Sequence, residues 1–180
     1  WLAAQKRLDL SKRVCDYEPK LPAHLGDIKL GQLLSNRGRV HHYRPNDPLG
    51  AGAPEHYTSA FDACRLFASD PLVDKPYLYS THGYTVFAAA LEKAIGKPFP
   101  DILESELSSP FGLRSVQCED LTKDPLERSK LYTLMQGPTP QVLSPLSLSW
   151  KYAGGGMEAH VLDLVRFGNL LLSGAILTSP

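Results

Sequence analysis

The sequence has no long apolar run and no excess charge of either sign. None of its hydrophobic stretches approaches the ~20 residues that a membrane-spanning helix needs. Lys and Arg together number 19, as do Asp and Glu, so the chain lacks the basic footprint typical of nucleic-acid binding. We therefore expect no nucleic-acid partner. With 180 residues, the chain is long enough for one globular region with its own core.

Cysteine is also scarce, which argues against a disulfide framework and against a zinc site. Cys15, Cys64 and Cys118 lie far apart, and none belongs to a CxxC or Cys/His pair with zinc-like spacing. Cys64 shares one face of an expected helix with Phe61 and Ala68, so buried packing is its expected role. A catalytic cysteine is the alternative.

Two further patterns resemble ligand sites and have simpler explanations. His41 and His42 are adjacent in an extended segment and point to opposite sides, so we expect them to lie on the surface or anchor a loop. The run Gly154-Gly155-Gly156 lacks the Gly-Lys-Ser/Thr ending of a phosphate-binding loop, so close backbone packing is the simpler role. The sequence therefore predicts no metal site and no cofactor.

The most informative stretch that is present is Tyr79-Ser80-Thr81-His82-Gly83-Tyr84, together with the helix that follows it. Ser80 and Thr81 are both good N-caps, and Gly96 is placed to cap the other end. Apolar residues recur between these ends at helical spacing: Tyr84, Phe87, Ala88, Leu91, Ala94 and Ile95. Tyr79 therefore lies just before the positive end of a helix, which favours an anion nearby.

The rest of the sequence predicts a mainly helical fold with a few short strands. We expect helices over residues 59–68, 101–107 and 161–172, and the end of a helix in residues 1–10. Strands are expected at residues 115–118 and 131–135. Residues 45–57 are rich in Pro and Gly, lack periodicity, and are expected to form a loop.

Five stretches, in the right order, resemble the serine β-lactamase and penicillin-binding-protein-like hydrolase family. Tyr79-Ser80-Thr81 is similar to the Tyr-x-Asn motif of class C β-lactamases, with Thr for Asn as in mitochondrial serine β-lactamase-like members. Segments 28–35, 110–113, 153–157 and 163–168 resemble the helix leading into the family's LLSHTSGI and its PLGM, AGGL and DLARFG segments. Residues 36–40 depart from that pattern, with Arg37 and Arg39 replacing small polar residues. The resemblance implies the helical part of a β-lactamase/DD-peptidase-like fold, mainly α here and α+β in the parent protein.

That family uses three motifs, of which this sequence carries only the middle one. No lysine has Ser three residues before it, so the Ser-x-x-Lys motif, which supplies the nucleophile and its lysine partner, is absent. The third motif, Lys- or His-x-Gly, is expected beyond the last residue, and the sequence begins with Trp1 rather than Met. We therefore expect residues 1–180 to be the central, mostly helical part of one longer hydrolase domain.

The resemblance implies a serine hydrolase that performs acyl transfer on an ester, peptide or β-lactam. Tyr79 would be the catalytic proton relay for a serine outside this chain, and Thr81 would bind the substrate, whereas His82 and Tyr84 would serve packing. The implied partners are a small-molecule or peptide substrate and the remainder of the polypeptide; the chain alone is expected to be inactive. The oligomeric state stays open, and a periplasmic or secreted location is the family-level expectation. The alternative is a non-catalytic relative that serves as an interaction or assembly module.

Overall fold

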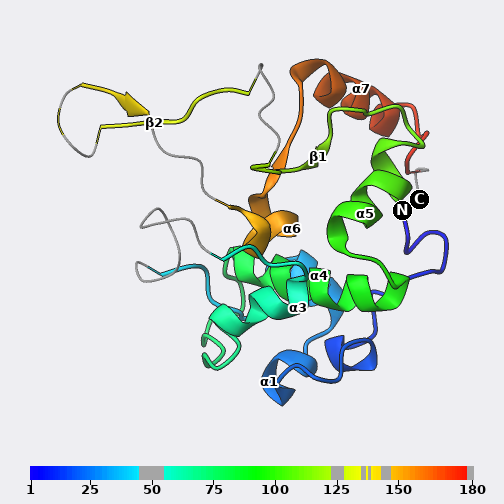
Figure 1. Ribbon diagram of the computed structural model, residues 1–180. Coiled ribbons are helices and arrows are strands. Elements are labelled where there is room, and N and C mark those ends of the chain that lie inside the picture. The colour runs from blue at the N-terminus through cyan, green and yellow to red at the C-terminus, as the bar shows by residue number, and fades with distance from the viewer. Residues whose placement is uncertain (45–54, 123–127, 135–136, 138, 143–146, 178–180) are drawn as a thin grey trace.

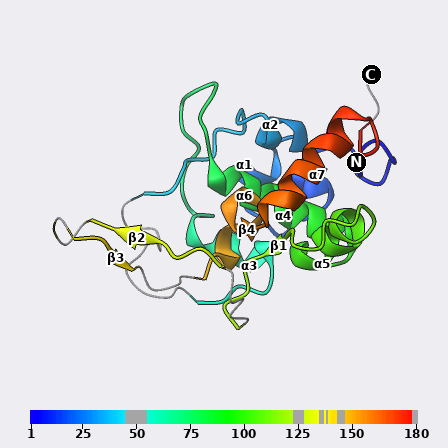
Figure 2. The ribbon, with the colours of Figure 1, turned by 90° about the horizontal axis from the view of Figure 1, so that it is seen from above.

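The computed structural model describes residues 1–44, 55–122, 128–134, 137, 139–142 and 147–177. Helix α4, Thr81–Ile95, runs through the middle of the molecule, and shorter helices surround it (Figures 1 and 2). This mainly helical architecture, with a few two-residue strands, confirms the fold class predicted from the sequence.

The other elements of the described chain are short. The α-helices are α1 (Ala23–Gly26), α2 (Leu30–Leu34), α3 (Ala60–Ala63), α5 (Phe99–Leu103), α6 (Tyr152–Gly155) and α7 (Val161–Leu172). The 3-10 turns are η1 (Val14–Asp16), η2 (Cys64–Leu66) and η4 (Ser149–Lys151), and η3 (Glu104–Ser108) is a π-helical turn. The strands are β1 (Gln117–Cys118), β2 (Tyr132–Thr133), β3 (Gln141–Val142) and β4 (Met157–Glu158).

Helix α4 begins and ends where the sequence predicts. Ser80 is the N-cap, and its Oγ accepts a hydrogen bond of 2.9 Å from the Gly83 amide. Gly96 ends the helix with a φ of 76°, a left-handed conformation that glycine adopts at little cost. The buried alanines Ala88 and Ala89 have short side chains, so neighbouring helices can approach α4 closely.

The hydrophobic core surrounds α4 on several sides. The first 40 residues contribute Val14, Leu30 and Leu33 to the core, each at most 1% exposed. Phe67, which directly follows η2, is buried in the same core. Cys64 is fully buried in the same core, which confirms its predicted packing role. Burial raises the pKa of its thiol, so the structure gives no support to a catalytic cysteine.

The N-terminal segment corrects one expectation. Residues 1–10 form a series of turns rather than the end of a helix, because Lys6 adopts a left-handed backbone with a φ of 59°. The Arg7 guanidinium nevertheless fixes this segment, since it donates two hydrogen bonds of 2.6 and 2.8 Å to Glu106 in η3. Sequence separation therefore does not prevent residues 1–10 from packing beside the helices that follow α4.

Both predicted strands are present but shorter than expected. Strand β1 pairs antiparallel with β4, and β2 pairs antiparallel with β3. Met135, which closed the second predicted strand, lies outside the described residues. The β2–β3 hairpin extends away from the helices in both views (Figures 1 and 2), so it contributes little to the core.

Helix α7 forms over the predicted residues but presents an apolar surface to solvent. Leu162, Leu164, Val165 and Leu172 are all more than half exposed. The buried residue of this helix is instead Asp163, whose carboxylate accepts hydrogen bonds from the backbone amide and hydroxyl of Ser115 at 2.8 and 2.7 Å. No helix in the described ranges combines the length and the apolar character that crossing a membrane requires.

Candidate active site

Three segments that are far apart in the sequence meet at the N-terminal end of α4. These are residues 36–44, residues 77–81 with the first turn of the helix, and the segment from η4 to β4. The Ser80 hydroxyl makes two contacts here. It accepts from the Gly83 amide, which caps the helix, and it donates to the His41 carbonyl oxygen at 2.9 Å, which fixes residues 36–44.

The departure from the family pattern at residues 36–40 gives this junction its own set of contacts. Asn36 accepts a hydrogen bond from the Ser80 amide through its side chain and one from the Leu78 amide through its carbonyl oxygen. Arg39 donates to the Val73 carbonyl oxygen at 2.8 Å and pairs with Asp74 at 3.1 Å. The side chains of Asn36 and Arg39 therefore hold the segment that leads to Tyr79.

Tyr79 points outward from this junction. Its side chain is 55% exposed, and within the described chain its hydroxyl forms no hydrogen bond. The ring lies edge-on to His42, with ring centroids 5.2 Å apart, and His42 in turn lies 3.8 Å from the Tyr43 ring. The phenol is thus oriented by aromatic contacts while its polar end is open to a reacting group.

Thr81 lies on the opposite, buried side of the same turn. Its side chain is 2% exposed, and its Oγ1 has no hydrogen-bond partner among the described residues. The Thr81 amide donates to His42 Nδ1 at 3.3 Å, so His42 contacts both candidate site residues. A buried hydroxyl without a partner is costly, so the described residues do not offset the burial of Thr81 Oγ1.

The glycine run packs beneath Thr81, as the sequence predicts. A β-carbon on Gly154 would lie 2.6 Å from Thr81 Cγ2 and 3.0 Å from the Thr81 carbonyl oxygen. A β-carbon on Gly156 would lie 2.8 Å from the Leu148 carbonyl oxygen. Glycine is therefore required here for close backbone approach, and the phosphate-loop interpretation has no structural support.

His41 and His82 are packed into the junction rather than presented by it. His41 Nε2 lies 2.7 Å from Asp70 Oδ2, which confirms the loop-anchoring role. His82 is fully buried and stacks on Phe67 with ring centroids 4.0 Å apart. Tyr84 donates its hydroxyl to the Leu34 carbonyl oxygen at 3.1 Å. Both His82 and Tyr84 therefore serve packing, as expected.

A cation lies next to the aromatic side chains of the site. The Lys151 Nζ is 5.2 Å from the ring centroids of both Tyr43 and Trp150, a distance typical of cation–π contact. Trp150 is 1% exposed and accepts a hydrogen bond from Thr85 through its carbonyl oxygen. The last residue of η4, Lys151, thus brings a positive charge to the same end of α4.

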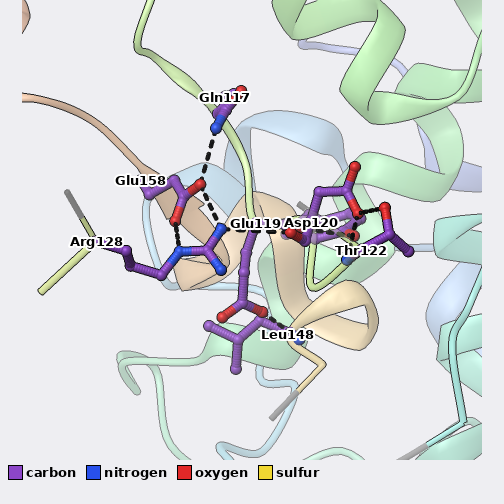
Figure 3. A network of polar contacts seen from close by, with 8 residues as sticks. Gln117, Glu119, Asp120, Thr122, Arg128, Leu148 and Glu158 are labelled. Atoms are coloured by element: carbon purple, nitrogen blue, oxygen red, sulfur yellow. Dashed lines mark hydrogen bonds and ion pairs between the residues drawn. The ribbon is translucent and has the colours of Figure 1, made fainter. Parts of the chain in front are cut away.

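A second polar network joins β1, Arg128 and β4 (Figure 3). Arg128 donates to both carboxylate oxygens of Glu158 at 2.8 Å, and Gln117 donates to Glu158 as well. Hydrogen bonding to Arg128 is the main reason that the pKa of Glu158 is lowered. Glu119 accepts the Leu148 amide at 3.0 Å, which ties β1 to the segment before η4.

Sequence reasoning missed several members of the site. His42, Tyr43 and Lys151 become neighbours of the candidate residues through tertiary contacts between distant segments, and no local pattern around them signals this. Within the described ranges, no group of three or more His, Cys, Asp or Glu side chains is arranged to hold a metal ion. The arrangement is instead an exposed phenol, a buried hydroxyl and a nearby ammonium, which suits proton transfer and hydrogen bonding to a ligand.

Curated relatives of the chain carry one name. The proteins called "Serine beta-lactamase-like protein LACTB, mitochondrial" from Mus musculus and Homo sapiens are each 34% identical over 125 residues. The matched region is 67% of this chain and 22% of each relative. The chain therefore corresponds to about a fifth of the length of these relatives.

Solved structures share the fold at lower identity. FmtA from Staphylococcus aureus matches with a TM-score of 0.80 at 16% identity, covering 98% of this chain and 48% of that one. D-amino acid amidase from Ochrobactrum anthropi, complexed with L-phenylalanine, matches with a TM-score of 0.79 at 22% identity, covering 99% and 52%. In addition, the family model described as Beta-lactamase matches residues 2–180. The chain therefore belongs to the beta-lactamase family.

Proposed function

We propose that residues 1–180 are the helical part of a serine hydrolase domain that transfers an acyl group from an ester, peptide or β-lactam. Tyr79 relays a proton for a serine that a Ser-x-x-Lys motif outside this chain supplies. Thr81 hydrogen-bonds the substrate. The chain by itself supplies no such nucleophile and is expected to be inactive, so the remainder of the polypeptide is its necessary partner.

The observation that carries this proposal is the contrast between Tyr79 and the other polar groups of the junction. Ser80 and Asn36 use their side chains in the local structure. The Tyr79 hydroxyl, by comparison, is exposed and unbonded within the described chain. It also lies just before the positive end of α4, where an anion is stabilised. A phenol held there is suited to general acid–base catalysis.

Thr81 supports the same proposal from the buried side. Its Oγ1 lacks a partner among the described residues, although an unsatisfied buried hydroxyl costs folding free energy. A substrate carbonyl or amide, or the lysine of the Ser-x-x-Lys motif, would satisfy it. A hydroxyl offers one donor where the carboxamide of the family's Asn offers two, which argues against strict β-lactam specificity.

The test uses the full-length protein and p-nitrophenyl acetate as substrate. Replacing Tyr79 by Phe is expected to lower kcat by a factor of about 10²–10⁴, the usual contribution of a general acid or base. Tyr77→Phe is the matched control, because Tyr77 is also exposed and lies two residues earlier; it should leave kcat unchanged. Equal activity of the wild type and the Tyr79 variant would overturn the assigned role.

The same experiment distinguishes the non-catalytic alternative. An interaction or assembly module would neither hydrolyse the ester nor be labelled by a fluorophosphonate probe, and the Tyr79 substitution would change nothing.

The compartment is a separate proposal: the relatives include proteins named mitochondrial and a penicillin-binding protein from Bacillus halodurans. A periplasmic or secreted location predicts that cell fractionation recovers the protein outside the cytoplasm.

A further inference from the structure

A cavity lies along α4, on the side that faces α3, α5 and η4. This cavity of about 200 Å³ is lined from α4 by Thr85, Ala88 and Glu92. Four aromatic residues complete much of its wall: Tyr57, Phe99, Trp150 and Tyr152. At a rise of about 1.5 Å per residue, Glu92 lies roughly 16 Å along the helix from Thr81. The carboxylate therefore lies well away from the candidate catalytic junction, although Thr85 and Trp150 line the cavity and also belong to that junction.

Glu92 is the acidic residue that lines this cavity. Its two carboxylate oxygens accept the Ala60 and Phe99 amides at 2.8 and 2.9 Å. In the described chain no Lys, Arg or His side chain forms an ion pair with it, and the charge that acts on it most is that of another acid, Asp62. Burial raises the pKa of the Glu92 carboxyl, as expected for an anion that lacks a cationic partner.

The carboxylate also has capacity to accept further hydrogen bonds. An ionised carboxylate has about four lone-pair sites, of which two backbone amides use two. The nearby rings present π-faces or edges, and tyrosine and tryptophan faces attract cations. The cavity therefore combines the two groups that recognise an organic cation, namely an unpaired carboxylate and aromatic walls.

The adjoining cavity has the same sign of charge. It measures about 680 Å³ and shares His56, Pro100 and Tyr152 with the first. Its acidic lining residues are Asp101, Glu104, Glu119 and Asp120, and no lysine or arginine is among the described residues that line either cavity. Arg128, which lies nearby, is committed to Glu158 through two hydrogen bonds (Figure 3). The acidic lining of this adjoining cavity therefore favours a cation and disfavours an anion nearby.

We propose that the cavity between α3, α4, α5 and η4 binds a small organic cation, a primary ammonium group carried on a compact aromatic body. The ammonium group binds Glu92, and the apolar body packs against Phe99, Trp150 and Tyr152. This site is distinct from the proposed hydrolase reaction, because its ammonium-binding group, Glu92, takes no part in the junction around Tyr79; Trp150 belongs to both. Its chemistry excludes anionic ligands, which both Glu92 and the acidic residues of the adjoining cavity repel.

The competing explanation is that Glu92 only satisfies the first amides of α3 and α5. That role accounts for the two hydrogen bonds. It predicts that the cavity binds charged and neutral ligands of the same shape with similar affinity. The two explanations therefore differ in one measurable quantity, the preference of the cavity for an amine over a neutral molecule of the same shape.

Phenethylamine and 2-phenylethanol form the matched pair of probes. Each is titrated at neutral pH into the full-length protein by isothermal titration calorimetry, with Trp fluorescence as a second readout because Trp150 lines the cavity. Phenethylamine is expected to bind at least about tenfold more tightly than the alcohol. Equal affinities of the two probes, or no saturable binding of the amine, would overturn the proposal.

Two variants and a control locate the binding. Glu92→Gln should reduce the preference for the amine to about twofold or less, whereas Glu55→Gln, the same charge change at an exposed residue outside the cavity, should retain it. Ala88→Leu should weaken both probes by filling the cavity while keeping the carboxylate, and it provides the test if Glu92→Gln does not fold. Unchanged binding in the Ala88 variant would place the amine elsewhere and contradict the site.

Discussion

Gly154 and Thr81 are in direct backbone contact, close enough that a β-carbon on the glycine would lie 2.6 Å from Thr81 Cγ2. The contact joins α6 to the first turn of α4. Because the two backbones touch, a shift of one helix would displace the other. Through this contact the glycine-rich segment fixes the position of the candidate substrate-binding residue.

Replacing Gly154 by Ala is therefore expected to destabilise the full-length protein by about 1–3 kcal/mol, the usual cost of overpacking. Gly168→Ala is the control. Gly168 lies inside α7, where an added β-carbon meets nothing within 4 Å, so alanine should instead stabilise by about 0.5–1 kcal/mol through its helix propensity. Urea unfolding of both variants checks the prediction, and similar effects at the two glycines would contradict it.

Thr81 and Thr85 give a second matched pair on α4. Both are 2% exposed, but Thr85 donates its hydroxyl to the Trp150 carbonyl oxygen and Thr81 has no partner in the described chain. Thr85→Val should cost about 1 kcal/mol of stability, since it leaves that carbonyl unsatisfied, and should keep kcat. Thr81→Val should lower kcat at least tenfold with a stability change below about 1 kcal/mol. Full ester hydrolysis by the Thr81 variant would remove Thr81 from the site.

The three cysteines should react with thiol reagents at different rates. Cys64 and Cys118 are buried, and burial raises the pKa of both thiols, that of Cys118 to about 12. Cys15 is partly exposed. Iodoacetamide applied to the native protein should therefore modify Cys15 first, and the other two should react only after addition of denaturant. Peptide mass spectrometry identifies the modified residues, and early labelling of Cys64 would contradict its buried position.

Asp163 predicts acid sensitivity. Hydrogen bonds from the amide and hydroxyl of Ser115 hold the pKa of its carboxyl at about 2 in the folded protein, against about 3.9 in an unfolded chain. A lowered pKa stabilises the folded state fully above pH 4, and this stabilisation is lost as the pH falls toward 2. Asp163→Asn should therefore be less stable than the wild type at pH 7 and lose less stability on acidification. Asp74→Asn, at an exposed position, should follow the wild-type pH profile in urea unfolding.

The local signals in the sequence proved sufficient for α4 and for the packing of the glycine run. Ser80 and Gly96 are caps whose chemistry acts within a few residues, so the helix could be predicted from its own sequence. The assignment of Cys64 to the interior was likewise confirmed, because apolar periodicity identifies the buried faces of helices. His82, which the family resemblance assigned to packing, is buried as well.

Tertiary contacts account for what the sequence did not reveal. Nothing near Glu92 signals that its carboxylate caps two helices from other parts of the chain, and nothing near His42 signals its contact with Tyr79. The helix prediction for residues 1–10 was wrong because Lys6 adopts a left-handed backbone conformation that interrupts a helix. Helix propensity alone does not predict this conformation. The catalytic roles of Tyr79 and Thr81 stay predictions until the substitutions above are measured.

The solvent-exposed leucines of α7 affect how residues 1–180 behave in solution when they are expressed alone. Leu162, Leu164 and Leu172 expose apolar side chains along α7. Exposed apolar patches promote self-association and bind hydrophobic dyes in water. Residues 1–180 expressed alone are thus expected to scatter light increasingly with concentration and to enhance the fluorescence of anilinonaphthalene sulfonate. Substituting Leu162 and Leu172 by Gln should abolish both effects, which would make the segment tractable as an isolated sample.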